Sequence, residues 1–206
     1  HLSHATFDGE VVIAANVLSQ AAEIVLNAKA LTIHQVQVNG AIATFSLHTE
    51  TERLVITPEV PLQPGTAAIS ISFSGVLNDS LRGFYRSTYT DENGVEKVIA
   101  ATQMQSTDCR QAFPCWNEPD FKAVFGITWV VDEQHLAISN GAQVSRTPAT
   151  PGRVSVRFAD TMSMCTYIVA FIVGPLEATE PIDVNGTPLR IIHVPGKSHL
   201  TDFGKR

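Results

Sequence analysis

The chain has 206 residues, of which 44% are hydrophobic and 17% charged, a composition typical of an ordered globular protein. Its 14 Lys and Arg residues against 20 Asp and Glu residues give a formal net charge of −6, and no basic block is present. The cation cluster that drives nucleic-acid binding is therefore missing, and we expect no nucleic-acid partner. The longest apolar run, residues 167–173, is far too short to span a bilayer, so we expect no membrane partner.

Apolar and polar residues alternate with a period of two along much of the chain, which predicts β-strands with one face on a core. In chain order, this alternation predicts strands over residues 11–17, 67–74, 121–131 and 153–159. Residues 167–173 are apolar on both faces and partly β-branched, which predicts a central buried strand. The expected fold class is all-β and mostly antiparallel.

The turn signals agree with this fold. Asn-Gly, the strongest short hairpin signal, occurs four times, at Asn39-Gly40, Asn93-Gly94, Asn140-Gly141 and Asn185-Gly186. Helix is scarce, and the best candidate is one short turn over residues 108–113, with Thr107 or Asp108 as its cap and Pro114 as its stop. No linker-like or low-complexity stretch divides the chain, so we expect a single domain.

Cysteine usage indicates the redox compartment. Cys109, Cys115 and Cys165 leave at least one thiol unpaired, and no C-x-x-C motif occurs. We expect three reduced thiols in a cytoplasmic protein. Cys115 stands beside Pro114 and Trp116 without an adjacent cation that would favour a thiolate, so we interpret it as a buried inert thiol rather than a nucleophile.

The histidine pattern predicts no metal site in this chain. His1 and His4 have H-x-x-H spacing but no acidic or thiol partner nearby, and no histidine belongs to an H-E-x-x-H motif. A G-x-S-x-G motif and a phosphate-binding glycine loop are also missing. From its residues alone the chain is β-rich, with no catalytic residues and no cofactor of its own.

One stretch carries a family signature. Residues 100–105 read A-A-T-Q-M-Q, and residues 107–119 read T-D-C-R-Q-A-F-P-C-W-N-E-P. Together they resemble the zinc aminopeptidase pattern A-T-Q-x-E followed by D-A-R-x-x-F-P-C-x-D-E-P. Further family motifs match in the correct order: Phe7-Asp8-Gly9, G-F-Y-R-S at 83–87, F-K-A at 121–123 and M-C-T-Y-I-V-A-F at 164–171. Several motifs in order make the resemblance specific.

The resemblance implies a saddle-shaped, sandwich-like β domain that packs against a thermolysin-like catalytic domain. The catalytic motifs of the family, G-x-M-E-N and H-E-x-x-H, are not in this sequence. We therefore expect residues 1–206 to be the single amino-terminal domain of a larger aminopeptidase, with the junction near residues 195–206. Zinc would belong to the catalytic domain of the parent protein, that domain would be the partner, and this chain by itself would hydrolyse nothing.

The resemblance also implies two substrate-binding residues. Gln103 would line the pocket for the first side chain of a peptide, and Gln105 would help to hold the α-ammonium at the peptide's amino terminus. A spacing of two fits a strand, because both side chains then project from one face while Met104 points the other way. Gln105 replaces the usual Glu, and exchanging a charged for a neutral hydrogen bond removes about 1 kcal/mol.

Asn117 is a second departure from the family pattern, because it replaces the Asp of the D-E-P turn. We interpret this turn as scaffold, in which Pro119 fixes the chain and Glu118 or Asp108 satisfies nearby backbone donors. We expect Arg110 to pair with one of these two carboxylates.

Two other functions stay open. A free-standing β-sandwich binding or interaction module without peptidase activity explains the alternation and the turns, but not the ordered motifs. A degenerate family member that serves as a scaffold is consistent with the departures at Gln105 and Asn117.

Overall fold

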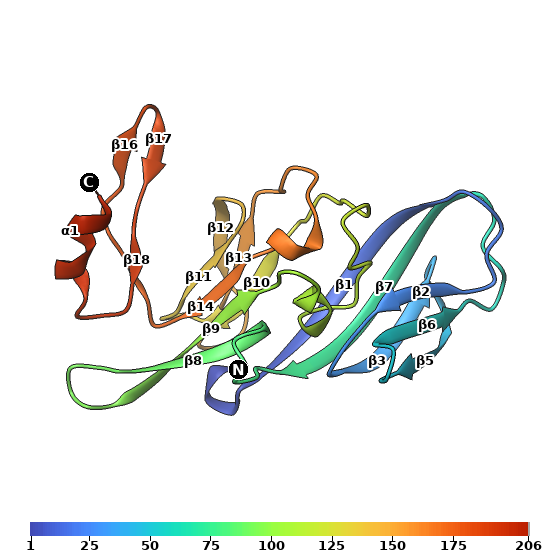
Figure 1. The fold of residues 1–206 in the computed structure, drawn as a ribbon, viewed down its shortest axis with the longest axis horizontal. Coiled ribbons are helices and arrows are strands. Elements are labelled where there is room, and N and C mark those ends of the chain that lie inside the picture. The colour runs from blue at the N-terminus through green and yellow to red at the C-terminus, as the bar shows by residue number, and fades with distance from the viewer. Residues whose placement is uncertain (206) are drawn as a thin grey trace.

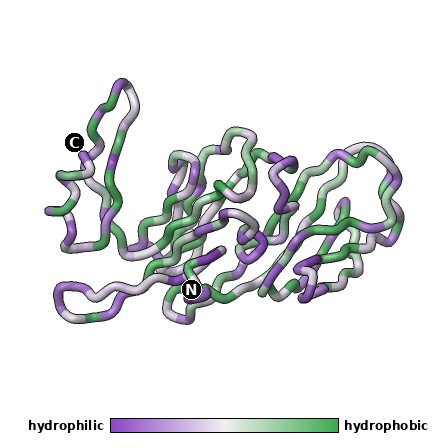
Figure 2. Tube along the Cα trace, in the orientation of Figure 1, coloured by the Kyte–Doolittle hydropathy of each residue, from purple (hydrophilic) through white to green (hydrophobic). Residues whose placement is uncertain are grey.

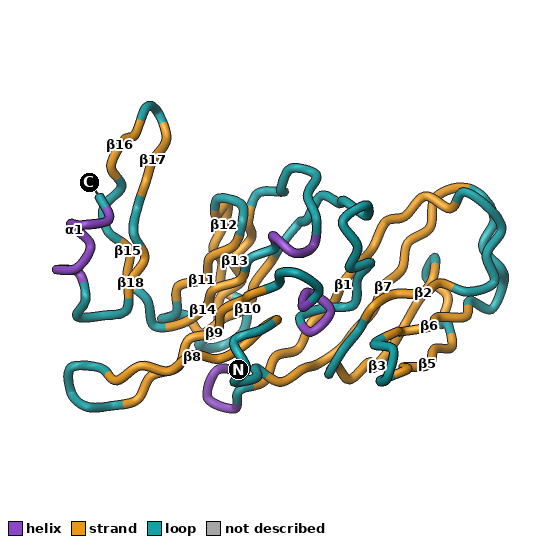
Figure 3. Tube along the Cα trace, in the orientation of Figure 1, coloured by secondary structure: helices purple, strands orange, loops and turns teal. Residues whose placement is uncertain are grey.

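The computed structural model describes residues 1–205, which form strands in antiparallel pairs joined by turns and by longer connections such as residues 104–127 (Figures 1 and 3). Polar and apolar residues interleave along the strands (Figure 2), so each sheet has one face suited to a core and one suited to water. The predicted fold class, all-β and mostly antiparallel, is confirmed.

Two sheets form the amino-terminal half. One has the order β1-β7-β3-β4 and the other the order β2-β6-β5. Their buried faces meet in a core that includes Val36, Ile71, Leu26 and Leu54. The bounds of these strands are β1 Thr6–Val17, β2 Ile24–Asn27, β3 Leu31–Val38, β4 Ala41–Ile42, β5 Thr44–His48, β6 Arg53–Thr57 and β7 Gly65–Val76.

Two more sheets form the middle of the molecule, with orders β8-β9-β14-β11 and β10-β13-β12. The first of them joins the large core through Phe84, Ala100 and Phe171, and a smaller core around Val156 and Val173 lies between the two. The bounds are β8 Gly83–Thr90, β9 Glu96–Gln103, β10 Thr128–Asp132, β11 Leu136–Ser139, β12 Gln143–Pro148, β13 Arg153–Phe158 and β14 Phe171–Gly174.

The last residues form an arm that projects from the sheets (Figure 1). It contains the pairs β15 (Glu177–Ala178) with β18 (Ile192–His193) and β16 (Ile182–Val184) with β17 (Thr187–Leu189), then the turn η4 (Ser198–Leu200) and the helix α1 (Thr201–Gly204). Phe203 on α1 is 87% exposed. Within residues 1–205 no helix is long and apolar enough to cross a membrane.

Three of the predicted strands are confirmed. Residues 11–17 lie in β1, residues 67–74 in β7, and residues 153–158 form β13. Each has the alternating pattern that one buried and one solvated face require. The register between β1 and β7 runs without interruption from Thr6↔Val76 to Val17↔Gly65.

The strand predicted over residues 121–131 is wrong in its first half, because β10 begins only at Thr128. Upstream of it, Ala123 forms an isolated bridge with Met164, and the Phe125 N–H donates to Oγ1 of Thr161 at 3.0 Å. Two loops that lie side by side therefore satisfy this backbone in place of a regular ladder.

The strand predicted over residues 167–173 also begins later than expected, at Phe171, and is preceded by the 3₁₀ turn η3 (Thr166–Ile168). The carboxamide of Asn140 accepts the Ala170 N–H and donates to the Ile168 carbonyl, both at 2.8 Å, which holds this backbone out of the ladder. The predicted central position is correct, since β14 lies between β11 and β9.

The predicted helical turn is present as the 3₁₀ turn η2 (Asp108–Gln111), which ends before Pro114. Thr107 occupies its cap position without a capping hydrogen bond from its side chain. The turns η1 (Leu2–His4), η3 and η4 and the helix α1 were not predicted, because they are single turns with no apolar period.

Two of the four Asn-Gly pairs form the predicted type I′ hairpins. Asn39 and Gly40 both have positive φ, 52° and 83°, and Asn185 and Gly186 have the same values. The pair at Asn140 does not form such a hairpin, because its carboxamide is used to fix η3.

Two aromatic rings lock β1 to β7. Phe7 is paired with Gly75, and Gly9 is paired with Phe73, so each ring lies over a glycine of the opposite strand. A Cβ atom placed on Gly9 would lie 2.4 Å from the Phe73 ring, and one on Gly75 would lie 2.4 Å from the Phe7 ring. The two glycines therefore provide the space into which the rings pack.

We predict that Gly9→Ala lowers the free energy of unfolding by about 1–3 kcal/mol, because the added methyl group displaces the Phe73 ring. The matched control is Ala14→Val, which enlarges an exposed residue of the same strand. Urea unfolding of both variants measures the difference. Equal stability of Gly9→Ala and the unmodified chain would contradict the packing described here.

Candidate functional site

The candidate site is the end of β9 and the residues that follow it. Gln103 is the last residue of β9 and is paired with Gly83 of β8. Met104 is 2% exposed and belongs to the core, whereas Gln103 and Gln105 are exposed. The predicted alternation of exposure is therefore observed, although β9 ends at Gln103 and Gln105 lies beyond the strand. Within residues 1–205 neither glutamine side chain has a hydrogen-bond partner, which leaves two amides open to a ligand.

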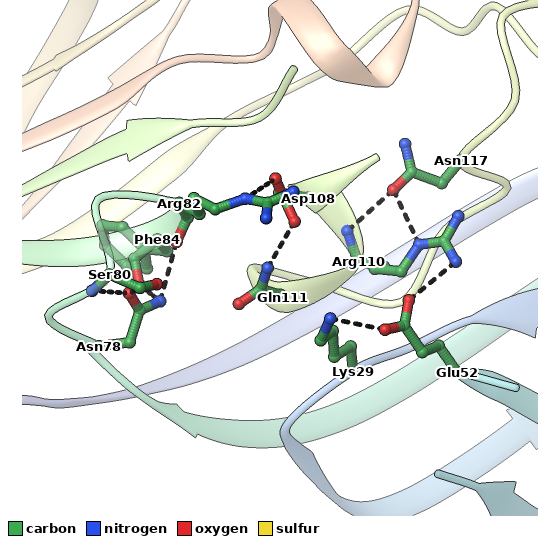
Figure 4. A network of polar contacts seen from close by, with 10 residues as sticks. All are labelled: Lys29, Glu52, Asn78, Ser80, Arg82, Phe84, Asp108, Arg110, Gln111 and Asn117. Carbon is green, nitrogen blue, oxygen red and sulfur yellow. Dashed lines mark hydrogen bonds and ion pairs between the residues drawn. The ribbon is translucent and has the colours of Figure 1, made fainter. Parts of the chain in front are cut away.

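A buried carboxylate holds this segment in place (Figure 4). Asp108 is 3% exposed, and its Oδ2 accepts a 2.9 Å hydrogen bond from Nε of Arg82. Its Oδ1 accepts a 2.7 Å hydrogen bond from Nε2 of Gln111. Its backbone N–H donates to the carbonyl of Met104 at 2.9 Å. Asp108 thus fastens the start of β8, the turn η2 and the residue between the two glutamines to one another.

A second polar network lies on the other side of η2 (Figure 4). Nη1 of Arg110 donates to Oε2 of Glu52 at 3.1 Å, and Nζ of Lys29 lies 2.6 Å from Oε1 of the same carboxylate. The expected pairing of Arg110 with Asp108 or Glu118 is therefore wrong. Its partner stands 58 residues earlier in the chain, at a turn that only the folded topology brings close.

Asn117 joins this network as scaffold. Its Oδ1 accepts the Arg110 backbone N–H at 3.1 Å, and its Nδ2 donates to Oγ1 of Thr166 at 2.9 Å. Its own backbone N–H donates to Oδ1 of Asn27 at 3.2 Å. Asn117, and neither Glu118 nor Asp108, therefore satisfies the backbone donor of η2. A carboxamide suits this buried position because it both accepts and donates.

The three thiols are buried and unpaired. Cys109, Cys115 and Cys165 are at most 8% exposed, and none is in a disulfide. Burial raises the pKa of the Cys109 thiol well above its usual value, which disfavours the nucleophilic thiolate. The buried position of Cys115 agrees with the interpretation of an inert thiol.

The residues present do not fit a zinc site. Across residues 1–205 no three His, Cys, Asp or Glu side chains gather in a group that would hold a metal ion. Nε2 of His1 contacts the carboxylate of Asp8 at 3.1 Å, and Nδ1 of His4 contacts the hydroxyl of Ser3. We therefore derive no chemical step through a metal from these side chains.

A wide groove lies elsewhere on the molecule. A groove of about 740 Å³ borders β1 and β10, and neither Gln103 nor Gln105 lines it. Sequence reasoning did not identify this groove, because it depends on which strands lie at the edges of their sheets.

Comparison with known proteins identifies the family. The Peptidase M1 N-terminal domain matches residues 1–168. The chain belongs to this family. It is 38% identical to the puromycin-sensitive aminopeptidase of Caenorhabditis elegans and 36% identical to aminopeptidase M1-D of Oryza sativa subsp. japonica, in each case over 98% of its own length. It is 35% identical, over 76% of its length, to endoplasmic reticulum aminopeptidase 1 of Homo sapiens.

These relatives are much longer proteins. The chain spans 22% of the nematode enzyme, 23% of the rice enzyme and 17% of the human enzyme. The resemblance stated from the motifs is confirmed, with the M1 N-terminal domain covering residues 1–168 of this chain.

We predict that Asp108→Ala lowers the free energy of unfolding by about 1–3 kcal/mol, because the donors of Arg82 and Gln111 lose a buried acceptor. The matched control is Asp79→Ala, which removes an exposed ion-pair partner of Arg86 and is expected to change stability little. Thermal or urea unfolding compares the two. An equal loss of stability in both variants would contradict the conclusion that Asp108 is the main contact that holds this segment in place.

The Glu52 carboxylate predicts a pH dependence of stability. Its hydrogen bond with Lys29, with a further contribution from Arg110, lowers the pKa of Glu52 from 4.5. A carboxylate whose pKa is lower in the folded than in the unfolded protein stabilises the fold at pH values above its unfolded pKa. This stabilisation is lost as the pH falls through the folded pKa. Below about pH 4.5 the unmodified chain should therefore lose stability more steeply than Glu52→Gln.

Urea unfolding at a series of pH values checks this expectation, with Glu23→Gln as the control at an exposed glutamate. The account is contradicted if the difference in stability between the unmodified chain and Glu52→Gln is the same at neutral and at acidic pH.

Proposed function

We propose that this chain is the substrate-anchoring amino-terminal domain of a zinc aminopeptidase that removes amino-terminal residues from peptides. Its family membership and the aminopeptidase names of its relatives support this function. The observation that carries the proposal is the pair of exposed glutamine amides at the end of β9, which have no partner within residues 1–205 and stand beside the buried Met104.

The two glutamines have different roles in this proposal. Gln103 lines the pocket for the first side chain of the peptide, and the carboxamide oxygen of Gln105 accepts a hydrogen bond from the peptide's α-ammonium. A neutral acceptor holds an ammonium less tightly than a carboxylate does. The hydrogen bond from the Asp108 N–H to the Met104 carbonyl holds the backbone between them, so the ordering cost of binding falls on the two side chains.

The proposed partner is the catalytic domain of the same polypeptide, which would hold the zinc ion and would follow a junction near residues 195–206. An exposed apolar surface supports a docked partner. The loops at 116–124 and 162–168 lie side by side through the bridge between Ala123 and Met164, and the rings of Trp116 and Phe121 stack. These loops expose Phe121, Val124, Met162, Tyr167 and Ile168 by 37–81%.

We propose that the parent protein is cytoplasmic. The supporting observation is the set of three buried thiols, none of which is in a disulfide.

We predict that Gln105→Glu in the full-length protein lowers KM several-fold for peptides with a free amino terminus, because a carboxylate gains about 1 kcal/mol over a carboxamide toward an ammonium. Steady-state kinetics with a series of short peptides measures the effect. The matched control is Gln35→Glu, which adds the same charge at an exposed glutamine of β3.

An unchanged or raised KM for Gln105→Glu would contradict the ammonium contact. A zinc-loaded full-length protein without peptidase activity would instead support the binding-module or scaffold function.

A further inference from the structure

The groove of about 740 Å³ is lined by two outermost strands, β1 and β10, and we call it the edge groove. Residues 7–11 of β1 and residues 125–130 around the start of β10 line it. Each of these strands is the outermost strand of its sheet, since β1 pairs only with β7 and β10 pairs only with β13. An outermost strand carries backbone groups without a ladder partner.

The register shows which β1 groups are open. In an antiparallel ladder, alternate residues direct their N–H and C=O toward the neighbouring strand and the others direct them away. The Leu77 N–H donates to the Ala5 carbonyl at 2.7 Å, which fixes this alternation. Asp8 and Glu10 therefore direct their backbone groups away from β7. The Thr6 N–H also points away from β7, since it donates to the His1 carbonyl, which lies outside the ladder.

The same reasoning applies to β10. The Phe158 N–H donates to the Ile127 carbonyl and the Glu133 N–H donates to the Gly152 carbonyl, both at 3.0 Å. Thr128 and Val130 therefore direct their backbone groups away from β13. Within residues 1–205, the backbones of Asp8, Glu10, Thr128 and Val130 have no hydrogen bond outside their own ladder. All four residues line the edge groove.

Aromatic side chains from several strands also line the groove. Phe84 contacts both Trp129 and Phe171, with ring centroids 5.7 and 5.9 Å apart. The indole N–H of Trp129 is buried and has no acceptor in the described part of the chain. Phe113, Phe125 and Trp129 are partly exposed and offer apolar contacts to a ligand, whereas Phe7, Phe73, Phe84 and Phe171 are at most 9% exposed. The rings that line the groove are Phe7, Phe73, Phe84, Phe113, Phe125, Trp129 and Phe171.

Two carboxylates lie on the β1 side of the groove. Asp8 and Glu10 are exposed along β1; Asp8 contacts Nε2 of His1 at 3.1 Å, and Glu10 has no cationic partner within residues 1–205. The guanidinium of Arg153, which also lines the groove, already lies 3.5 Å from Asp132. A bound segment with Lys or Arg residues would therefore complement the β1 side.

We propose that the edge groove binds an extended peptide segment by strand addition. The main chain of the segment pairs with the open edges of β1 and β10, alternate apolar side chains contact the aromatic rings, and cationic side chains face Asp8 and Glu10. Five residues of β1 span about 17 Å, which fits a bound segment of about five residues. This site requires no free amino terminus, so it is independent of Gln103 and Gln105.

Fluorescence anisotropy with the 206-residue chain and a labelled N-acetyl-Lys-Val-Lys-Val-Lys-amide peptide tests the proposal. The blocked amino terminus prevents the ammonium contact proposed for Gln105. We expect saturable binding, and at least about tenfold weaker binding of the same peptide with N-methylated backbone amides, which cannot pair with a strand. No saturable binding, or equal binding of the methylated peptide, would overturn the proposal.

Proline variants locate the site. Val130→Pro and Glu10→Pro each remove an N–H that points into the groove and leave the ladder hydrogen bonds intact. We expect each to weaken binding at least about tenfold. The matched control is Ala14→Pro, which removes an outward N–H from the same edge of β1 beyond the groove and should bind normally. Circular dichroism identifies the variants that fold. Because the two groove positions lie on different strands, the test can still be carried out if one of the two variants does not fold.

Three results would overturn the assignment. The first is an equal loss of binding in Ala14→Pro. The second is a concentration-dependent dimer that Val130→Pro converts to a monomer, which would make a second copy of this chain the occupant. The third is peptide binding by this chain that disappears in the full-length protein, which would make the rest of the polypeptide the occupant.

Discussion

The buried carboxylate of Asp108 is the contact on which the candidate site depends most. It accepts hydrogen bonds from Arg82 at the start of β8 and from Gln111 in η2, and its N–H binds the Met104 carbonyl. Because Met104 stands between the two exposed glutamines, their backbone is held by Asp108, which is itself buried. A backbone held in this way loses little conformational freedom when a ligand arrives, so the ordering cost falls on the two exposed side chains.

The second network extends this support to the amino-terminal sheets. Arg110 binds Glu52, Asn117 binds Asn27 and Thr166, and the backbones of Asn27 and Cys115 bond to each other. The stretch from Gln103 to Asn117 is therefore fastened on both sides. This support of the backbone agrees with the proposed role of the two glutamines in holding a substrate.

Local sequence pattern predicted the all-β fold class and three of the strands, and its failures have physical causes. The period of two identified β1, β7 and β13, and the spacing of two between Gln103 and Gln105 anticipated their exposure. It failed near Phe125 and Ile168, where Thr161 and Asn140 satisfy the backbone through side chains. The partner of Arg110 and the edge groove could not be predicted, because both depend on segments brought together only by the fold.

One measurement tests the anchoring role most directly. A peptide with a diazirine on its first side chain and a non-cleavable first bond is bound to the full-length protein, irradiated and mapped by mass spectrometry. The account predicts adducts in the stretch that contains Gln103 and Gln105, and none there when the diazirine is on the last residue. Adducts from the first residue that map only outside this stretch would contradict it.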